Sequence, residues 1–267
     1  MTETHRAKPR HLAPEYAAQF GDEEVGAAYR HRPPYPPETF LVLESLLGTR
    51  PRIVLELGAG TGDFTIGLAP HADELIAVEP SRPMLERGLA RAGALHHQVE
   101  WLTVAAEDYG FDRRYAAVVS AEAFHWLDWQ SVMPRIARSL VPSGYLILVE
   151  RALAAPLPWD ADLSALIRAY STNRDYAPYD TVAELEARRL IAVAGRAQTD
   201  TVVHLQNIDD YVESFHSRNG FSRARLPSPR AQEFDERLRI LVRRHCHADS
   251  VRLPVQARIA WGRPTGG

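Results

Sequence analysis

The sequence predicts an α/β fold with a doubly wound parallel sheet, and three observations lead to this expectation. Short apolar runs of strand length alternate with helix-like segments between residues 52 and 150. These runs are apolar throughout, as parallel strands are when helices cover both faces of their sheet. A glycine-rich turn, GAGTG at 58–62, follows the first run. Sheets of this kind bind ligands at such turns, at the carboxyl ends of their strands.

Each element is expected from its local pattern. Residues 1–15 are rich in charge and proline and predict a mobile tail, and the prolines at 33, 34, 36 and 37 exclude a continuous helix after it. The expected strands are 53–57, 74–79, 98–104, 115–120, 144–149, 199–206 and 253–263. The expected helices are 39–47, 61–69, 81–92, 130–140, 160–170, 181–194, 208–217 and 230–247.

After Glu150 the alternation of strand-like and helix-like segments gives way to mostly helix-like segments, and this change predicts how the chain is organised. Residues 1–35 are expected to form a tail and lid segment, and residues 36–150 a ligand-binding core. Residues 151–267 are expected to add a helical cap together with two late strands that complete the sheet.

Composition narrows the function classes. A net charge of −3 gives no basic excess for nucleic acid, and the apolar runs are too short to span a membrane. One cysteine, Cys246, forms no internal disulfide, which suits a reducing compartment, so a cytoplasmic protein is expected. The expected assembly is a monomer or a homodimer. The single lysine, Lys8, lies in the predicted tail, which argues against a catalytic lysine.

Gly58, Gly60 and Gly62 stand where the first strand turns into a helix, so that a ligand can approach bare backbone and free amides. A dinucleotide-binding turn has the pattern G-x-G-x-x-G. Here the third glycine comes one position early, and Asp63 would repel a pyrophosphate. The same carboxylate is compatible with a cofactor that carries an ammonium and a sulfonium.

The stretch ELGAGTG resembles the first motif of the class I S-adenosylmethionine-dependent methyltransferases. Glu79, about 20 residues beyond the turn, is similar to the acid of that family that binds the ribose hydroxyls. Glu107 and Asp108 resemble the loop at the adenine amino group, although acids are common in loops of any function. The resemblance implies the Rossmann-like methyltransferase sheet of seven strands, the last pair antiparallel, with helical cap insertions.

The segment AEAFHWLDW at 121–129 resembles a small-molecule branch of the family that includes trans-aconitate methyltransferases. That resemblance places the segment at the methionine end of the cofactor, where aromatic faces attract a sulfonium and exclude water. Trp129 is expected instead to pack in the core. His125 is the candidate catalytic residue, since a neutral imidazole accepts a proton near pH 7. The alternative is that His125 only hydrogen-bonds the acceptor.

YRHRPPYPPETF resembles the lid segment of the same branch, whose arginine grips a carboxylate. The resemblance implies S-adenosylmethionine as cofactor, no metal and a small-molecule acceptor. The predicted cofactor-binding residues are Tyr29, Arg32, Glu56, Gly58, Ala59, Gly60, Thr61, Gly62, Glu79, Pro80, Met84, Ala106, Glu107, Asp108, Ser120, Ala121 and Phe124. The predicted acceptor-binding residues are Tyr35, Trp126, Tyr176, His216 and Arg218.

Other functions remain open at this point. His245, Cys246 and His247 diverge on a helix and have no second ligand cluster, so a metal site is not expected. The cofactor motifs are compatible with methylation of a macromolecule, which requires an open basic face around 160–230. They are also compatible with a cofactor-binding protein that catalyses another step.

Overall fold

The structure of the protein is a computed structural model that describes residues 8–93, 99–246 and 248–265. Its sheet has the strand order β3-β2-β1-β4-β5-β8-β6, and β7 also pairs with β8. The strands are β1 Ile53–Leu57, β2 Glu74–Val78, β3 Val99–Leu102, β4 Tyr115–Ala121, β5 Leu140–Leu153, β6 Ile191–Gln198, β7 Val202–Asn207 and β8 Ser250–Pro264.

The first five strands are parallel, and β8 runs antiparallel to β5, β6 and β7. In β1 the register matches Glu56 to Ala77 of β2 and to Val119 of β4. The carboxyl ends of β1, β2 and β4 therefore meet at one edge. The predicted doubly wound α/β class is confirmed.

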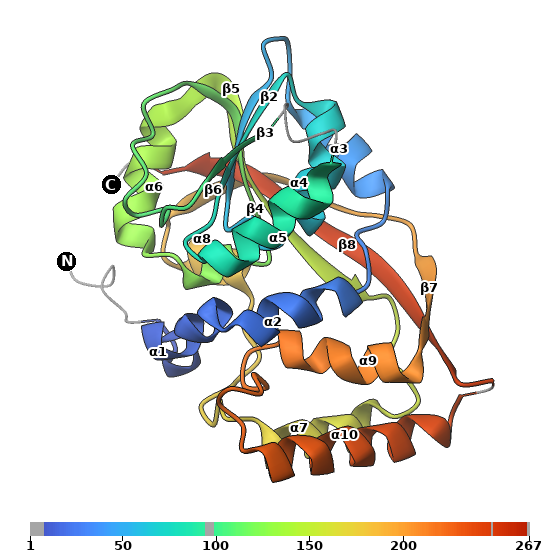
Figure 1. The fold of residues 1–267 in the computed structure, drawn as a ribbon. Helices are drawn as coiled ribbons and strands as arrows, with labels where there is room; N and C mark the ends of the chain where they lie inside the picture. The colour runs from blue at the N-terminus through green and yellow to red at the C-terminus, as the bar shows by residue number, and fades with distance from the viewer. Residues whose placement is uncertain (1–7, 94–98, 247, 266–267) are drawn as a thin grey trace.

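Helices cover both faces of the sheet (Figure 1). Phe40 of α3 and Phe64 of α4 pack on one face, and Val132 of α6 and Leu185 of α8 pack on the other. The helices are α1 Pro14–Ala17, α2 Glu23–Ala28, α3 Glu38–Leu46, α4 Asp63–Leu68, α5 Arg82–Ala92, α6 Trp129–Ser139, α7 Asp160–Tyr170, α8 Thr181–Ala187, α9 Ile208–Ser214 and α10 Ser228–Arg243. Among the described residues no helix has both the length and the apolarity to cross a membrane.

The cap consists of α7, α9 and α10, which lie together beside the sheet (Figure 1). It has a core of its own, to which Phe215, Phe234 and Leu238 contribute fully buried side chains. Val251 and Val255 of β8 belong to the same core. The cap is therefore built onto the first half of β8.

The sequence-based boundaries were wrong after residue 187. The expected helix 181–194 ends at Ala187, and the expected strand 199–206 is preceded by an additional strand, β6. Residues of β6 alternate between more and less buried positions, which suits a strand with one covered face. The 15 residues of β8 are long enough to pair with β6 at one end and β7 at the other.

The expected mobile tail was also wrong for its described part. Lys8 donates from Nζ to the carbonyl oxygens of His125 and Leu127, the first at 3.1 Å, and its Nζ lies 4.3 Å from the Trp129 ring centre. Leu12 is buried. The chain from Lys8 onward is thus packed against the segment that follows β4.

Candidate active site at the strand ends

The glycine turn joins β1 to α4 and is bonded to β2. The amides of Gly58 and Ala59 both donate to the Val78 carbonyl oxygen, at 2.8 and 3.0 Å. Gly58, Gly60 and Gly62 have φ angles of +80°, +57° and +76°, in the left-handed region that other residues disfavour. The course of the backbone therefore requires glycine at every second position.

The three glycines differ in their surroundings. A β-carbon on Gly58 would lie 2.4 Å from the β-carbon of Ala123, and one on Gly62 would lie 2.8 Å from the Trp101 ring. Internal packing thus accounts for two of them. A β-carbon on Gly60 would meet, among the described residues beyond its chain neighbours, just the flexible end of the Met84 side chain within 4 Å, at 3.7 Å. Gly60 is therefore where the turn offers bare backbone to a ligand.

Glu79 directly follows β2 and reaches the turn. Its Oε2 accepts a hydrogen bond from the Gly60 amide at 2.9 Å, and its Oε1 accepts one from the Ser81 amide at 2.8 Å. Burial raises the pKa of Glu79, and these two amides oppose the rise. The carboxylate holds the turn in place, and each oxygen keeps a lone pair for ligand hydroxyls.

Glu56 is the penultimate residue of β1, just before the glycine turn, and it is 1% exposed. Burial raises its pKa to about 8, although the nearby Thr65 hydroxyl opposes the rise. Neither carboxylate oxygen makes a hydrogen bond of ordinary geometry within the described part of the chain. Buried carboxylates rarely lack partners. The position therefore suits a ligand group that is cationic or donates hydrogen bonds.

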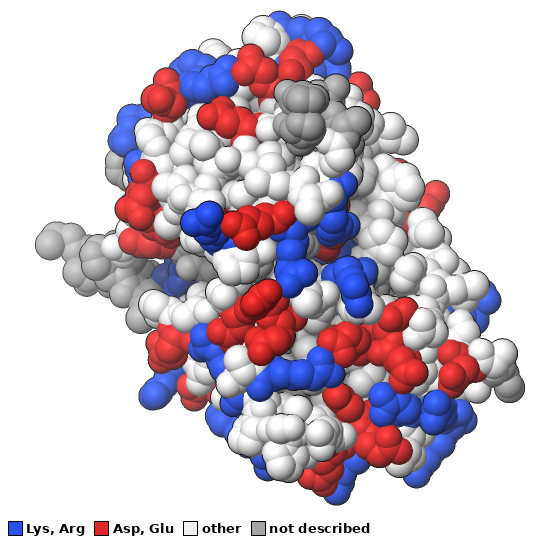
Figure 2. Space-filling model, viewed as in Figure 1, with Lys and Arg blue, Asp and Glu red and all other residues white. Residues whose placement is uncertain are grey.

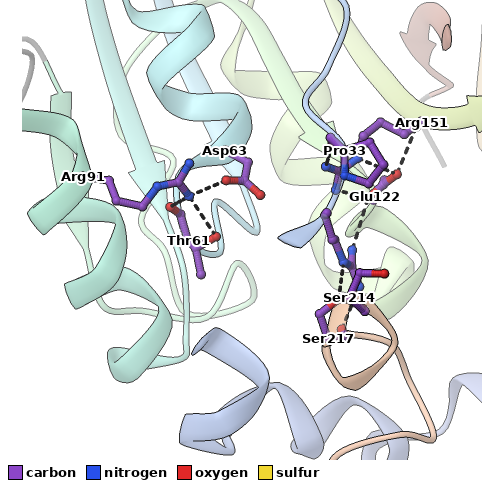
Figure 3. Close-up of polar contacts among 9 residues, drawn as sticks. Pro33, Thr61, Asp63, Arg91, Glu122, Arg151, Ser214 and Ser217 are labelled. Atoms are coloured by element: carbon purple, nitrogen blue, oxygen red, sulfur yellow. Dashed lines mark hydrogen bonds and ion pairs between the residues drawn. The ribbon is translucent and has the colours of Figure 1, made fainter. Parts of the chain in front are cut away.

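Asp63, the first residue of α4, is paired within the protein. Arg91 of α5 donates to the Asp63 carboxylate and, at 3.0 Å, to the Thr61 carbonyl oxygen (Figure 3). This pairing removes much of the repulsion that the sequence suggested between Asp63 and a pyrophosphate. The distinction from a dinucleotide site therefore does not rest on this acid.

A cavity of about 850 Å³ opens beyond the carboxyl ends of β4 and β5. Phe20 and Trp126 on its wall meet edge to face, with ring centres 5.5 Å apart. Ala123 also lines the cavity, and its contact with Gly58 places the cavity next to the glycine turn. Seven of the predicted site residues line it: Tyr29, Arg32, Ser120, Phe124, His125, Trp126 and Arg218.

Glu122, directly after β4, joins four segments of the chain (Figure 3). Its Oε2 accepts hydrogen bonds from Arg151 at 2.8 Å and from Arg32 at 3.3 Å. Arg151 also donates to the Pro33 carbonyl oxygen at 2.6 Å, and Arg32 donates to the Ser217 hydroxyl at 2.8 Å. The lid, two strand ends and the cap meet at this carboxylate.

The electrostatics of Glu122 follow from these partners. Burial would raise its pKa, but Arg151 and Arg32 outweigh that effect and lower the pKa to about 2. Its φ angle is +55°, which is uncommon outside glycine and is found at functional sites. The carboxylate is therefore ionised at neutral pH.

His125 lies in a 3-10 turn, Phe124–Trp126, on the cavity wall. Burial lowers the pKa of His125 to about 4, and nearby Lys8 adds to the decrease while Glu122 opposes it. The imidazole is thus neutral at pH 7. Its ring nitrogens make no hydrogen bond to the described residues, so the ring can accept a proton or a hydrogen bond from an acceptor.

The predicted acceptor-binding residues separate into two groups. Trp126 and Arg218 line the cavity. Tyr35 is buried below the Arg151 guanidinium, and Tyr176 is 66% exposed. His216 is buried in the cap, with one ring nitrogen bonded to a carbonyl and the other to a carboxylate. The structure does not bring Tyr35, Tyr176 or His216 to the cavity, and His216 has no nitrogen left for an acceptor.

The adenine-loop acids also differ from each other. Glu107 accepts a hydrogen bond from the Asp128 amide at 2.7 Å, so it fastens its loop to the start of α6. Asp108 and Pro80 are exposed, whereas Ala106 is buried. Ala121 closes β4 opposite Val149. None of these contacts by itself assigns a ligand.

Sequence reasoning missed Glu122 and Arg151. The signal was present: an acid follows the fourth strand and an arginine lies near the end of the fifth. Because β4 and β5 are parallel neighbours, with Ala121 opposite Val149, residues just beyond them come together. Opposite charges near adjacent strand ends are compatible with an ion pair, but only the structure shows that Glu122 pairs with Arg151.

Among the described residues no group of three or more histidine, cysteine, aspartate or glutamate side chains is arranged to hold a metal ion. His247 lies outside the described residues.

Comparisons with known proteins agree with this geometry. Residues 54–144 match the family model described as a methyltransferase domain. An uncharacterized methyltransferase of Mycobacterium tuberculosis is 40% identical over 143 residues, which cover 54% of this chain and 56% of that protein. The chain thus spans little more than half the length of the curated relatives it matches most strongly.

Solved structures share the fold over most of the chain. A putative type II methyltransferase from Anaeromyxobacter dehalogenans aligns with a TM-score of 0.60 and 22% identity, covering 88% of this chain and 99% of that one. A Geobacter sulfurreducens S-adenosylmethionine-dependent methyltransferase, solved with S-adenosyl-L-homocysteine, aligns with a TM-score of 0.50 and 16% identity, covering 95% and 99%. Residues 54–144 thus contain a methyltransferase domain, and the fold of most of the chain is one that solved methyltransferases share.

Proposed function

We propose that the protein transfers a methyl group from S-adenosylmethionine to a small-molecule acceptor. The observation that carries the proposal is Glu56, a buried carboxylate for which the described residues supply no hydrogen bond of ordinary geometry, beside a glycine turn that contacts an aromatic cavity. A cofactor with an ammonium group would supply the partner that Glu56 lacks. The cavity would then receive the acceptor next to the turn.

The residues present fit the cofactor. Glu56 would pair with its ammonium, Gly60 would let its backbone approach, and Glu79 would accept hydrogen bonds from its ribose hydroxyls. When bound, S-adenosylmethionine supplies an electrophilic methyl: an acceptor lone pair bonds to the methyl carbon as the carbon–sulfur bond breaks and its electrons neutralise the sulfonium.

The chain's own residues would orient the acceptor and exclude water. The faces of Tyr29, Phe124 and Trp126 would attract the positive charge by roughly 0.5–2 kcal/mol while keeping the cavity dry. His125, neutral at pH 7, would take the proton of an acceptor hydroxyl or amine. Alignment of this kind lowers barriers by about 7–11 kcal/mol when it is ideal.

The size of the cavity, and the contribution of the cap to its wall, favour a small molecule over a polymer. The cavity volume of about 850 Å³ lies in the usual range for small-molecule sites, and Arg218 and Asn219 of the cap contribute to its wall. On the face shown in Figure 2, acidic and basic side chains are interspersed over the cap. A surface that binds nucleic acid is expected to gather basic charge instead.

Calorimetry with S-adenosylmethionine and S-adenosylhomocysteine tests the proposal, followed by a screen for transfer of labelled methyl to hydroxy acids and phenols. Both cofactor forms are expected to bind. Gly60→Val is expected to abolish binding while leaving the fold intact by circular dichroism. No binding by the wild type, or undiminished affinity in Gly60→Val, would refute the placement of the cofactor. Binding without transfer to any acceptor class would favour a non-methylating role.

A further inference from the structure

Arg218 differs from the other charged residues of the cavity. It follows the 3-10 turn Phe215–Ser217, and its guanidinium carbon lies 3.9 Å from the centre of the Phe215 ring. The side chain is exposed and lines the cavity. Within the described part of the chain it makes no ion pair and no side-chain hydrogen bond, although a guanidinium has five donors.

Three other arginines on the cavity wall have acidic partners. Arg32 and Arg151 share Glu122, and Arg196 is paired with Glu186. A fourth, Arg258, lies opposite Glu150 on the neighbouring strand. Among these arginines, Arg218 is therefore the one whose charge is not balanced by a contact with an acidic side chain of the described residues.

The charges around Glu122 do not cancel. Arg32 and Arg151 act electrostatically on Arg218, and Glu122 is the carboxylate that acts on all three arginines, although Asp63 acts on Arg151 as well. Three positive groups and one negative group leave a formal charge of +2. Protein around Arg218 displaces water and lowers its pKa even though the side chain remains exposed to the cavity. Such a site favours an anion.

We propose that Arg218 binds an anionic group, a carboxylate or a phosphate, of the methyl acceptor; this inference rests on the proposed methyltransferase function. A guanidinium that grips an anion withdraws electron density from it and weakens it as a nucleophile. The bound anion is therefore the handle, and the methylated atom is a second group of the acceptor. That second group lies toward His125, which has ring nitrogens available on the same cavity wall.

The cofactor's own carboxylate is the other source of such an anion. Two features favour the acceptor. Arg218 comes from the cap, and the charged groups that act on it are Arg32 of the lid segment together with Glu122 and Arg151 at the ends of β4 and β5. The cofactor's ammonium and ribose are expected at Glu56 and Glu79, which lie at the opposite side of the strand ends.

The experiment compares Arg218→Gln and Arg218→Lys with the wild type, with Arg196→Gln as the matched control on the same cavity. Calorimetry with S-adenosylhomocysteine comes first. All four proteins are expected to bind it with the same affinity. A loss confined to the Arg218 variants would show that this arginine holds the cofactor carboxylate and would overturn the inference. Absence of binding in the wild type would instead refute the proposed function.

Acceptor binding is then measured on protein saturated with S-adenosylhomocysteine, using hydroxy acids and their neutral amides, for example 4-hydroxyphenylacetate and 4-hydroxyphenylacetamide, with phosphate monoesters as a second anion class. Wild type and Arg196→Gln are expected to prefer the anions by about 10- to 100-fold. Arg218→Gln is expected to abolish that preference, and Arg218→Lys to retain part of it. Equal binding of acids and amides, or no anion bound by a wild type that binds the cofactor, would overturn the inference.

Discussion

Glu56→Gln tests the role of the buried carboxylate most directly, because it removes the charge and keeps the shape. In the free protein, burial raises the pKa of Glu56 to about 8, against an ordinary value of 4.5. Folding therefore favours the protonated form. Below pH 4.5 the raised pKa does not lower the free energy of unfolding. As the pH rises from 4.5 to about 8, it lowers the free energy of unfolding progressively.

The magnitude follows from the size of the shift. A difference of roughly 3.5 pKa units corresponds to about 5 kcal/mol above pH 8, as an upper limit, and to about 3 kcal/mol at pH 7. Glu56→Gln is thus expected to unfold less readily than the wild type at pH 8–9 and almost equally at pH 4. The same change is expected to weaken S-adenosylhomocysteine binding by about 10- to 100-fold, because the ammonium loses a charged partner.

Urea unfolding at pH 4, 7 and 9, with calorimetry on the same samples, measures both effects. Glu74→Gln is the matched control, since Glu74 is an exposed acid at the start of the neighbouring strand. It is expected to change stability by no more than about 0.5 kcal/mol. A variant that is less stable than the wild type at every pH, or that binds the cofactor product with unchanged affinity, would show that Glu56 is a structural residue.

Three further predictions concern the same strand ends. Glu79→Ala is expected to weaken S-adenosylhomocysteine binding by about 1–3 kcal/mol in calorimetry; unchanged affinity would remove the ribose assignment. Glu122→Gln is expected to lower unfolding free energy by about 3 kcal/mol at pH 7, since the pKa of Glu122 is lowered to about 2. That difference holds above pH 4.5 and disappears as the pH falls toward 2; a difference independent of pH would contradict it. His125→Ala is expected to slow methylation of a phenol or alcohol by about 10²–10⁴, with no wild-type inflection near pH 6.5; a full-rate variant would make His125 a wall residue.

The part of the fold that the sequence predicted well is the part with local signals. The first four strands follow apolar runs, and α5 begins at Arg82 after Ser81, whose hydroxyl accepts from the Met84 amide. The sequence after Ala187 contains no comparable local signal for a helix or a strand. IAVAGRAQ has small residues compatible with either a helix or a strand, and only its pairing with β8 decides the outcome.

The candidate site shows the same division. Gly60 and Glu79 were predicted because a turn and a strand end fix them locally, and their bond to each other is consistent with that reasoning. Glu122, Arg32 and Ser217 come together from segments up to 185 residues apart, which no local pattern encodes. The prediction that His216 binds the acceptor was wrong for the same reason, because the residues around His216 in the sequence do not reveal that Asp235 bonds its ring.

The pairing of β8 determines how readily the cap could be exchanged as a unit. Val255 pairs with Leu153 of β5 on one side and with Val202 of β7 on the other. Residues before it pack in the cap, whereas Ala257 and Ile259 pack in the core of the half that carries the glycine turn. Excision of residues 154–249 would therefore strip β8 of two partner strands. Because the cap cannot be removed without this loss, we expect a change of acceptor preference to come from replaced side chains on the cavity wall and not from exchange of the whole cap.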